Sequence, residues 1–287
     1  MTSGKEPEYL YRYVPPKMDW IRTPIVYQKI FFPSVKQFND PFDCATGIRF
    51  PDPDHLSGSD IWDLRKLSEF ILEPDADTEL DGRWEKRLQE LVNDGVFTGD
   101  DFDALLREVN GPAVVRRDEQ RFLCLSEDPK NIPMWSHYAD KHKGVALQFK
   151  PNHSQMPIWG TRVRYRKAVP SLAEFMTILR RYAKNDDRRA VGIFRIFYGH
   201  KHTMWRCEKE WRVMTDSSDG YHKLPAGPLS LTGVILGLHV QPDTVSGVNK
   251  WVRQAQRTLR RKLRIYRTTR LPDSFSLRCT AQDGHTL

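Results

Sequence analysis

The chain has 287 residues, of which 39% are hydrophobic, so it can bury the core of one large domain or of two small ones. It carries a formal net charge of +8, and no apolar run approaches the ~20 residues that a membrane-spanning helix needs. The first residues, MTSGKEPEYL, lack the apolar core of a secretory signal peptide. We therefore expect a soluble, cytoplasmic protein with no membrane partner.

Short strands dominate the elements predicted for the first fifty residues. Aromatic and β-branched residues favour extended backbone, and Pro, Asn and Asp favour the turns between strands. The expected elements are a strand over residues 9–14, about one helical turn over 18–23, one or two short strands over 25–34 and a turn in FNDPFD, residues 38–43.

An acidic segment follows this N-terminal part. Residues 51–110 carry seventeen acidic and six basic side chains. Apolar residues recur there at partial helical spacing, interrupted by Gly95, Gly99 and Gly111. We expect residues 51–120 to form a helical insertion within a single domain that spans residues 1–287.

Strands and helices alternate through the rest of the chain. A capping box, Ser171 with Glu174 three residues later, begins one helix, and Pro242 suits the first turn of another. A further helix is expected over residues 188–198. The expected strands cover residues 121–127, 143–150, 161–168, 231–238, 263–269 and 275–279. This order predicts an α+β fold with mixed and antiparallel sheets.

The stretch CEKEWRVMTD, residues 207–216, places Glu208 and Glu210 directly before an apolar run. In a strand, alternate residues point to one side, so both carboxylates would share a face and raise each other's pKa. One carboxylate can then stabilise a developing cation while its neighbour takes a proton. The alternative is structural, with the two glutamates forming ion pairs with Arg206 and Arg212.

Three other short stretches, LYRY, FNDPFD and MWSHYA, combine polar groups with large rings. Aromatic walls around a few polar groups suit a planar ligand. FNDPFD also fits a structural turn in which Asn39 and Asp40 bond to the backbone and the two phenylalanines anchor it. MWSHYA fits a helical turn with Trp135 and Tyr138 in the core and His137 satisfied there, or a pocket that His137 lines.

The C-terminal part carries a basic stripe, because residues 250–270 contain nine basic and no acidic side chains. Such a stripe suits a polyanionic partner such as nucleic acid, and a solvated helix face is the alternative. The expected nucleic-acid contacts are Arg257, Arg260, Arg261 and Arg264.

No phosphate loop, dinucleotide fingerprint, nucleophile elbow or HExxH motif is present. The four cysteines are far apart and form no CxxC pair, so we expect free, buried thiols. We expect no metal. A metal-dependent nuclease or hydrolase stays an alternative, and its ligands would come from scattered residues: Asp40, Asp43, His137, His200, His202 and Glu210. His200 and His202 fit either one strand face or the surface near a helix end.

FNDPFD, LSED, MWSHYADKHKGVALQF and EKEWRV together resemble a widespread bacterial family known only as a domain of unknown function, number twenty-nine seventy-one. LTGVILGLHV followed by LRIYRTT is similar to the C-terminal pattern of that family. The resemblance extends from about Tyr9 to Cys279, and residues 51–115 contain no motif of the family. Membership in this family implies no particular activity.

A more distant pattern is similar to the Arg-Ser-Glu mono-ADP-ribosyltransferases: an Arg in an early strand, a Ser ending a middle strand and Glu-x-Glu entering a late strand. Here these are Arg12, Ser126, Glu208 and Glu210. The resemblance implies that Arg12 steadies NAD and Ser126 holds the nicotinamide ribose. Glu210 would bind the ribose 2′-hydroxyl and support an oxocarbenium-like transition state, and Glu208 would orient or deprotonate the acceptor. The family usually has Ser-Thr-Ser at the middle strand, and only one serine of this motif is matched here, by Ser126.

The transferase resemblance implies an ADP-ribosyltransferase-like core and NAD as substrate. The enzyme would modify nucleic acid or protein, as toxins and phage-defence effectors of this kind do. The residues expected around NAD are Tyr11, Arg12, Tyr13, Asn39, Asp40, Phe42, Ser126, Trp135, His137 and Tyr138. The rings of Tyr11, Tyr13, Trp135 and Tyr138 are expected to surround nicotinamide. The central expectation is that Arg12 and Glu210 meet in one hollow. A non-enzymatic nucleic-acid-binding module is the other alternative.

Overall fold

The computed structural model describes residues 7–44, 48–49, 57, 96–97, 120–152, 154, 160–182, 198–215, 219–224, 228–260 and 262–287. The chain divides into two compact units. The first comprises residues 1–33, 121–162 and 204–287, and the second comprises 34–120 and 163–203. A single domain with an insertion over residues 51–120 stays a prediction, because nearly all of that segment lies outside the described residues.

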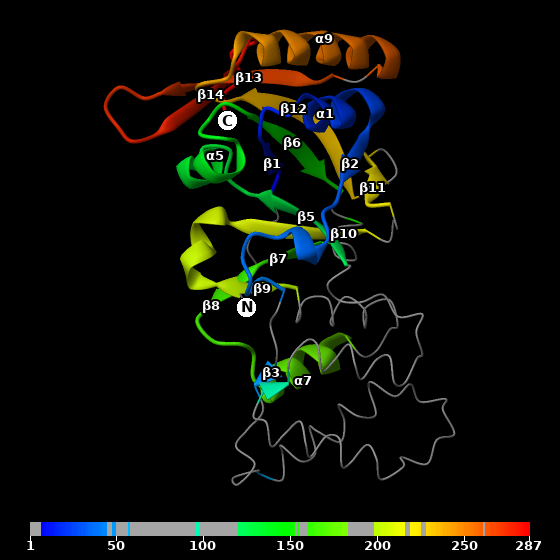
Figure 1. Ribbon diagram of the computed structural model, residues 1–287, viewed down its shortest axis with the longest axis vertical. Helices are drawn as coiled ribbons and strands as arrows, with labels where there is room; N and C mark the ends of the chain where they lie inside the picture. Colours follow the sequence, from blue (N-terminus) through cyan, green and yellow to red (C-terminus); the bar gives the residue numbers. More distant parts are fainter. Residues whose placement is uncertain are drawn as a thin grey trace. The chain divides into compact units, whose positions relative to one another are not determined.

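An eight-stranded sheet forms the centre of the first unit (Figure 1). Its strands are β1 (Leu10–Val14), β5 (Arg121–Ser126), β6 (Val145–Pro151), β7 (Gly160–Arg162), β10 (Glu210–Thr215), β12 (Leu229–Leu236), β13 (Arg264–Arg270) and β14 (Leu277–Ala281). Their order is β14-β13-β12-β6-β1-β5-β10-β7, and only β12 and β13 run parallel. The predicted mixed, mostly antiparallel architecture is therefore confirmed.

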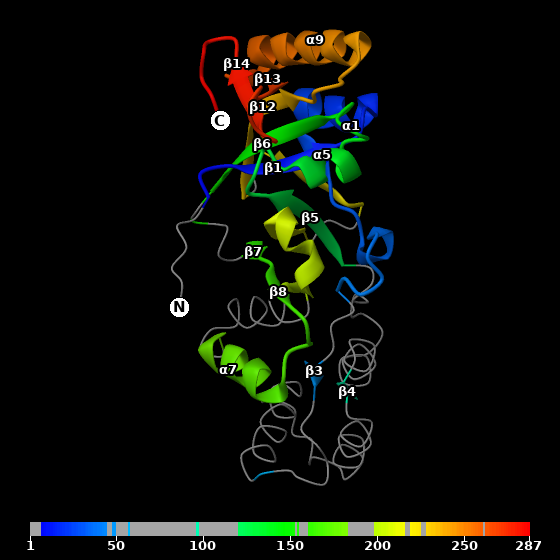
Figure 2. The same cartoon turned by 90° about the vertical axis from the view of Figure 1, so that its left-hand side faces the viewer.

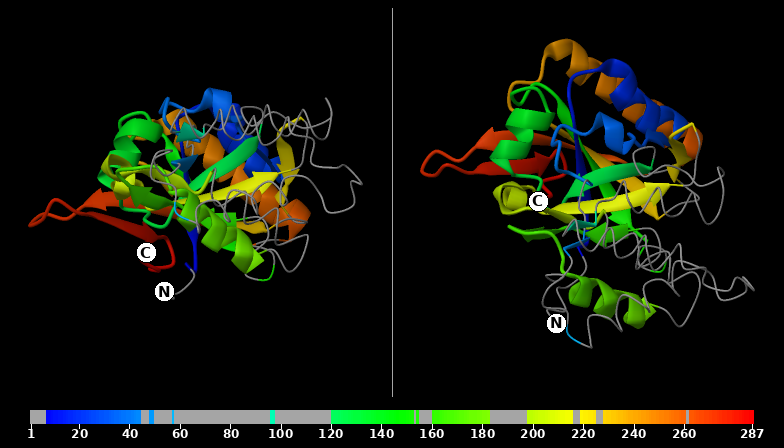
Figure 3. Two further views of the ribbon diagram at one scale, coloured as in Figure 1. Left: turned by 90° about the horizontal axis from the view of Figure 1, so that it is seen from below. Right: turned by 60° about the horizontal axis from the view of Figure 1, so that its bottom comes forward.

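Helical elements pack on both faces of this sheet (Figure 2). They are α1 (Met18–Arg22), the π-helical η1 (Thr23–Tyr27), α5 (Ile132–Tyr138), the 3-10 helix η5 (Thr203–Glu208) and α9 (Pro242–Leu259). Helices α1 and α9 lie side by side (Figure 3) and share one core with the sheet, whereas α5 contributes to the core of the opposite face. Among the described residues, no helix is long and apolar enough to cross a membrane.

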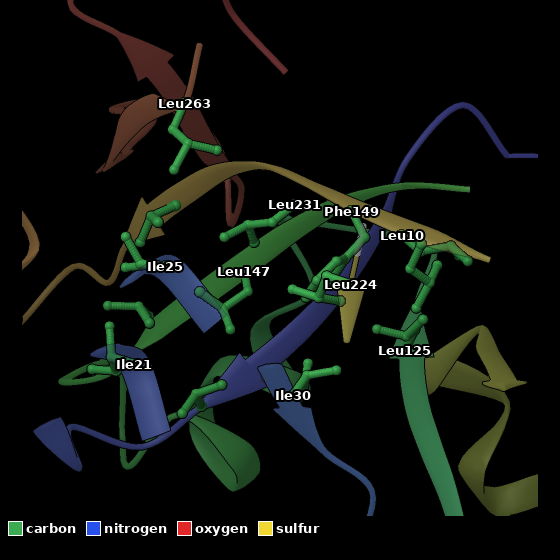
Figure 4. Close-up of a cluster of buried hydrophobic side chains, with 14 of the residues drawn as sticks. Leu10, Ile21, Ile25, Ile30, Leu125, Leu147, Phe149, Leu224, Leu231 and Leu263 are labelled. Carbon is green, nitrogen blue, oxygen red and sulfur yellow. The ribbon is translucent and has the colours of Figure 1, made fainter. Parts of the chain in front are cut away.

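The larger hydrophobic core lies between the sheet and the helices α1 and α9 (Figure 4). Leu147 and Phe149 of β6 point into it, together with Ile21 of α1 and Ile25 of η1. Residues two apart on a strand share a face, so alternate apolar residues of β1, β5 and β6 build this core. Burial of these side chains, at about 25 cal/mol per Å² of apolar surface, drives the layers together.

A β-bulge keeps β12 facing this core along its whole length. The register against β6 shifts between Leu231 and Gly233. The extra residue changes the alternation, so Leu231 before the bulge and Val234 after it belong to the same core. Without the bulge, one half of this strand would direct these side chains to the opposite face of the sheet.

The opposite face of the sheet carries a second core around α5. Tyr11 and Tyr13 of β1 pack there with Ala146, Tyr266 and the fully buried Trp135. Strand β1 therefore separates its residues cleanly: Leu10 and Val14 face α1 and α9, and the two tyrosines face α5.

The turn that joins α5 to β6 has an unusual backbone. Asp140, Lys141 and His142 are consecutive left-handed residues, with φ of 46°, 54° and 67°. Gly144 follows, and a Cβ at this position would lie 2.0 Å from the carbonyl oxygen of Val14. No side chain fits there unless β1 or the turn moves, so Gly144 allows β6 to approach the end of β1.

The second unit contains short elements and α7. The described elements are η2 (Val35–Gln37), β3 (Ile48–Arg49), β4 (Val96–Phe97), β8 (Arg164–Arg166), β9 (His200–His202) and α7 (Leu172–Tyr182). Strands β3 and β4 pair antiparallel, and β8 and β9 pair parallel. The predicted capping box of α7 is confirmed, since Glu174 accepts from the Ser171 N–H at 2.9 Å and the Ser171 hydroxyl accepts from the Glu174 N–H at 3.4 Å.

Three sequence-based element predictions are wrong. Residues 25–27 are π-helical rather than extended, because they continue η1 from Pro24. TRVRYRKA is not one strand: β7 joins the large sheet, and β8 pairs with β9 in the second unit. Residues 96–97 form strand β4 within the segment that we expected to be helical. A helix over 188–198 stays a prediction, because all but Tyr198 lies outside the described residues.

The first unit also contains a two-stranded sheet of β2 (Lys29–Phe31) and β11 (Tyr221–Lys223). The strands pair antiparallel, and the rings of Phe31 and Tyr221 lie 5.3 Å apart between centroids. β2 thus matches one of the short strands predicted over residues 25–34.

Gly144→Ala should destabilise the protein by about 1–3 kcal/mol or more, because the new methyl group forces the backbone of Val14 to move. Urea unfolding would measure the change. Lys143→Ala is the control, since its exposed ion pair with Asp140, at 3.7 Å, contributes about 1 kcal/mol or less. Equal stability of Gly144→Ala and the wild type would contradict the close approach.

The pH dependence of stability should include a contribution from His142. Its ring stacks on Trp135 at 6.0 Å and meets His239 at 5.9 Å. Burial, followed by the nearby His239 and Arg270, lowers the pKa of His142 in the folded protein. The unfolded chain therefore binds this proton more readily, and stability falls as the pH drops below about 6.5.

His142→Asn should flatten this part of the pH profile, and asparagine tolerates the left-handed backbone at this position. Urea midpoints at pH 5, 6, 7 and 8 would measure the difference from the wild type. A variant profile that parallels the wild-type profile would show that His142 titrates alike in both states.

Candidate active site

A buried polar cluster lies where β5 ends and β10 begins. Strand register pairs Ser126 with Tyr11 on one side and with Glu210 on the other. Directly paired residues of neighbouring strands point to the same face, so Tyr11, Ser126 and Glu210 form a row across three strands. This row lies on the α5 face of the sheet, where Tyr11 belongs to the α5 core.

Glu208 reaches this cluster from outside the sheet. It is the last residue of η5, and Lys209, with a left-handed φ of 48°, separates it from the first strand residue, Glu210. The prediction that Glu208 and Glu210 share a strand face is therefore wrong. A left-handed residue ends the alternation, and the backbone of Glu208 follows a helical path instead.

Hydrogen bonds hold Glu208 in the cluster, where it is 4% exposed. The Tyr138 hydroxyl donates to its Oε1 at 2.7 Å, and the Ser126 hydroxyl donates to its backbone oxygen at 2.7 Å. The Asn131 side chain donates to the backbone oxygen of Cys207, the preceding residue. Strand β5 and helix α5 thus position this glutamate through side chains of both elements.

Glu210 and Arg212 form a buried, two-point ion pair. Arg212 Nε donates to Glu210 Oε1 at 2.8 Å, and Nη2 donates to Oε2 at 3.1 Å. The side chains are 0% and 4% exposed for Arg212 and Glu210 respectively. The ion-pair interpretation is therefore confirmed for Glu210. The guanidinium stabilises the carboxylate anion in a position that the strand backbone keeps rigid.

Arg12 does not join this cluster. It lies next to Tyr11 on β1, and because neighbouring strand residues point to opposite faces, its side chain projects from the face opposite to Glu210. Its Nη1 donates to the backbone oxygen of Cys124 at 3.0 Å. The expectation that Arg12 and Glu210 meet in one hollow is wrong, and the cause is the two-residue period of the strand.

The rings predicted to surround nicotinamide mostly pack against one another. The centroids of Tyr13 and Trp135 are 5.0 Å apart in an edge-to-face contact, and both rings are buried. Trp135 donates to the Pro129 carbonyl at 2.9 Å, and Tyr13 donates to that of Asp128 at 2.5 Å. Of these rings, Tyr138 directly contacts a catalytic candidate, and it does so through its hydroxyl group.

Burial also keeps the two tyrosines of β1 protonated. It raises the pKa of Tyr11 to about 12 and the pKa of Tyr13 well above its usual value. Both are therefore neutral, and Tyr13 acts as a hydrogen-bond donor. His137 is exposed in the last turn of α5, so the expectation that it is a satisfied core residue is wrong.

FNDPFD forms the predicted turn in the second unit. Asp40 is buried and accepts from the Phe42 N–H at 2.9 Å, which is the backbone bond that we expected. Phe42 is 79% exposed and does not anchor the turn. Asn39, in the same turn, also has an interaction partner. Asp43 forms a buried ion pair with Lys201, at 3.4 Å.

The residues considered for a metal site do not form a ligand cluster in the described part of the chain. No group of three or more His, Cys, Asp or Glu side chains lies close enough there to hold an ion. His200 and His202 lie on β9, His200 buried and His202 exposed, so they are not both surface residues near a helix end.

The residues predicted to contact nucleic acid do not all lie on one element. Arg257 is exposed on α9, and Arg260 follows the helix with a left-handed φ of 49°. Arg264 lies on β13 and bonds to Asp283 at 3.1 Å, and Arg261 lies outside the described residues. Lys250 and Arg253 precede Arg257 on the same helix and belong to the basic stripe, but they were not among the predicted contacts.

Comparison with known proteins finds one family. A model described as "Protein of unknown function (DUF2971)" matches residues 134–213, which include MWSHYA and the EKEWRV glutamates. The match supports the resemblance that these motifs predicted, over less than half of the chain. No curated protein and no solved structure matches the chain. The resemblance to mono-ADP-ribosyltransferases stays a prediction.

Arg212→Met should destabilise the protein by about 3–5 kcal/mol, because it leaves the Glu210 carboxylate buried without its counter-charge. The double variant Glu210→Leu/Arg212→Met should recover most of this loss, since it buries no charge. Urea unfolding measures both. Arg162→Met is the control: its partly exposed pair with Glu127, at 2.9 Å, should contribute about 1 kcal/mol or less. A double variant as unstable as the single one would contradict the argument.

Proposed function

We propose that the protein is an NAD-dependent ADP-ribosyltransferase with Glu208 and Glu210 as its reacting groups and a macromolecular acceptor. One observation carries the proposal: both glutamates belong to a single buried polar cluster with Ser126 and Tyr138. The proposal keeps the serine and the glutamates of the Arg-Ser-Glu pattern. It does not use Arg12, which projects from the other face of the sheet.

Glu210 is suited to stabilise positive charge. In the reaction, the bond between the nicotinamide nitrogen and ribose C1′ breaks, and its electron pair leaves with nicotinamide. The ribose becomes cationic, and a fixed carboxylate stabilises that state more than the ground state. Arg212 holds both oxygens of Glu210, so the carboxylate needs little reorganisation as the charge develops.

Glu208 is suited to accept a proton. An oxygen or nitrogen of the acceptor forms the new bond to C1′ and loses its proton, which Glu208 takes as general base. The Tyr138 hydroxyl, at 2.7 Å from Oε1, orients the carboxylate. Ser126 fixes the backbone of Glu208 rather than the ribose, so the proposal gives this serine a positioning role.

Access to the cluster is part of the proposal. Glu208 and Glu210 are each 4% exposed, so NAD reaches them only when neighbouring groups move. Buried charges surrounded by hydrogen bonds are costly to rearrange, and the binding energy of NAD would have to supply that cost. The metal-dependent nuclease alternative has no comparable cluster in the described part of the chain.

Incubation of the purified protein with NAD labelled in the adenylate part tests the proposal. We expect nicotinamide release and label transfer to nucleic acid or protein in a cell extract. Glu210→Gln keeps the shape of the side chain and should lower the rate by about a hundredfold or more, because the charge facing the cationic ribose is lost. Tyr138→Phe removes only the bond to Glu208 and should lower it less.

Glu127→Gln is the matched control, because this carboxylate bonds to Trp211 at 2.6 Å next to the cluster and has no role in the proposed reaction. Circular dichroism and urea unfolding of each variant separate a lost fold from a lost reaction. Absence of nicotinamide release from the folded wild-type protein with every acceptor, or equal rates for Glu127→Gln and Glu210→Gln, would contradict the proposal.

A further inference from the structure

We infer that the outer face of α9 is a binding surface for the phosphate backbone of nucleic acid. A shallow hollow there is lined by Lys250, Arg253 and Arg257 together with the polar Ser246, Asn249 and Gln254. This inference goes beyond the proposed transferase function and does not depend on it.

The fold presents this face to solvent by burying the other one. Val248, Trp251, Val252 and Ala255 of α9 are buried in the core that α9 shares with α1 and the sheet. The basic residues lie on the opposite side of the helix, and Lys250, Arg253 and Arg257 are all exposed. The amphipathic pattern therefore leaves a cationic surface on a rigid, eighteen-residue helix.

The spacing of the three cations matches successive phosphates. Residues 250, 253 and 257 are three and four positions apart, so they fall on one side of the helix over about 10 Å of its axis. One strand of a duplex carries a phosphate about every 3.4 Å along the duplex axis, which gives roughly three phosphates over this distance. The amide and hydroxyl groups between the cations add hydrogen bonds to phosphate oxygens.

The same geometry favours nucleic acid over a membrane surface. A helix that lies on a membrane inserts its apolar face among the lipids. The apolar face of α9 is already covered by the sheet and α1, so only its polar and cationic face is available. The net charge of +8 adds a general attraction to polyanions, and α9 provides a local surface for it.

Fluorescence anisotropy with a labelled twenty-base-pair DNA duplex of arbitrary sequence tests the inference over a range of salt concentrations. The triple variant Lys250→Gln/Arg253→Gln/Arg257→Gln should bind about tenfold more weakly or worse. Its slope of log affinity against log salt should be shallower by about 2–3, because three phosphate contacts are lost at about 0.9 each.

Lys29→Gln/Lys150→Gln/Arg278→Gln is the matched control. It removes the same three charges from exposed positions on β2, β6 and β14. We expect this control to keep most of the wild-type affinity and slope, which distinguishes a local surface from net charge.

The inference would be overturned by no duplex binding of the wild type, by equal losses in the two triple variants, or by an unchanged salt slope in the α9 variant. Tighter binding to phosphatidylserine vesicles than to DNA, lost in the α9 variant, would also overturn it in favour of a membrane surface. Glu210→Gln should not change DNA binding, so a failed transferase assay leaves this test intact.

Discussion

The two-residue alternation of the strands is the constraint on which the first unit depends. In β1 it sends Leu10 and Val14 to the core beneath α1 and α9, and it sends Tyr11 and Tyr13 to the core around α5. Strand β1 pairs with β5, and β5 pairs with β10, so Ser126 and Glu210 point to the same face of the sheet as Tyr11. A shift of one residue in any of these pairings would move the polar cluster to the opposite core.

The polar cluster combines two kinds of stabilisation. The Glu210–Arg212 pair is held within one strand, with both partners buried and both carboxylate oxygens bonded. Glu208 is held between elements, by Tyr138 of α5 and Ser126 of β5. Because a buried ion pair is weak support for stability in itself, its cost requires another explanation. The proposed transferase chemistry offers one, since it uses a carboxylate that is already fixed.

Helix α9 packs on the face of the sheet opposite to the polar cluster. Its buried side is part of the larger core, and its exposed side carries Lys250, Arg253 and Arg257 among polar side chains. The buried glutamate cluster lies on the α5 side of the sheet and the basic face of α9 belongs to the other side, and both are part of the first unit.

Elements with local patterns were predictable from the amino-acid sequence. The strands β1, β5, β6 and β13, the capping box of α7 and the apolar stripe of α9 all follow from side-chain period and terminal residues, and the glutamates of EKEWRV were recognisable as unusual. Tertiary structure decided the rest. Strand period shows that Arg12 and Tyr11 point to different faces, but only pairing between distant segments shows that Glu210 shares the face of Tyr11. The left-handed backbone of Lys209 was also invisible, because nothing in a lysine side chain favours that conformation. The pairing of strands is a property of the folded chain, since it depends on which distant segments are brought together.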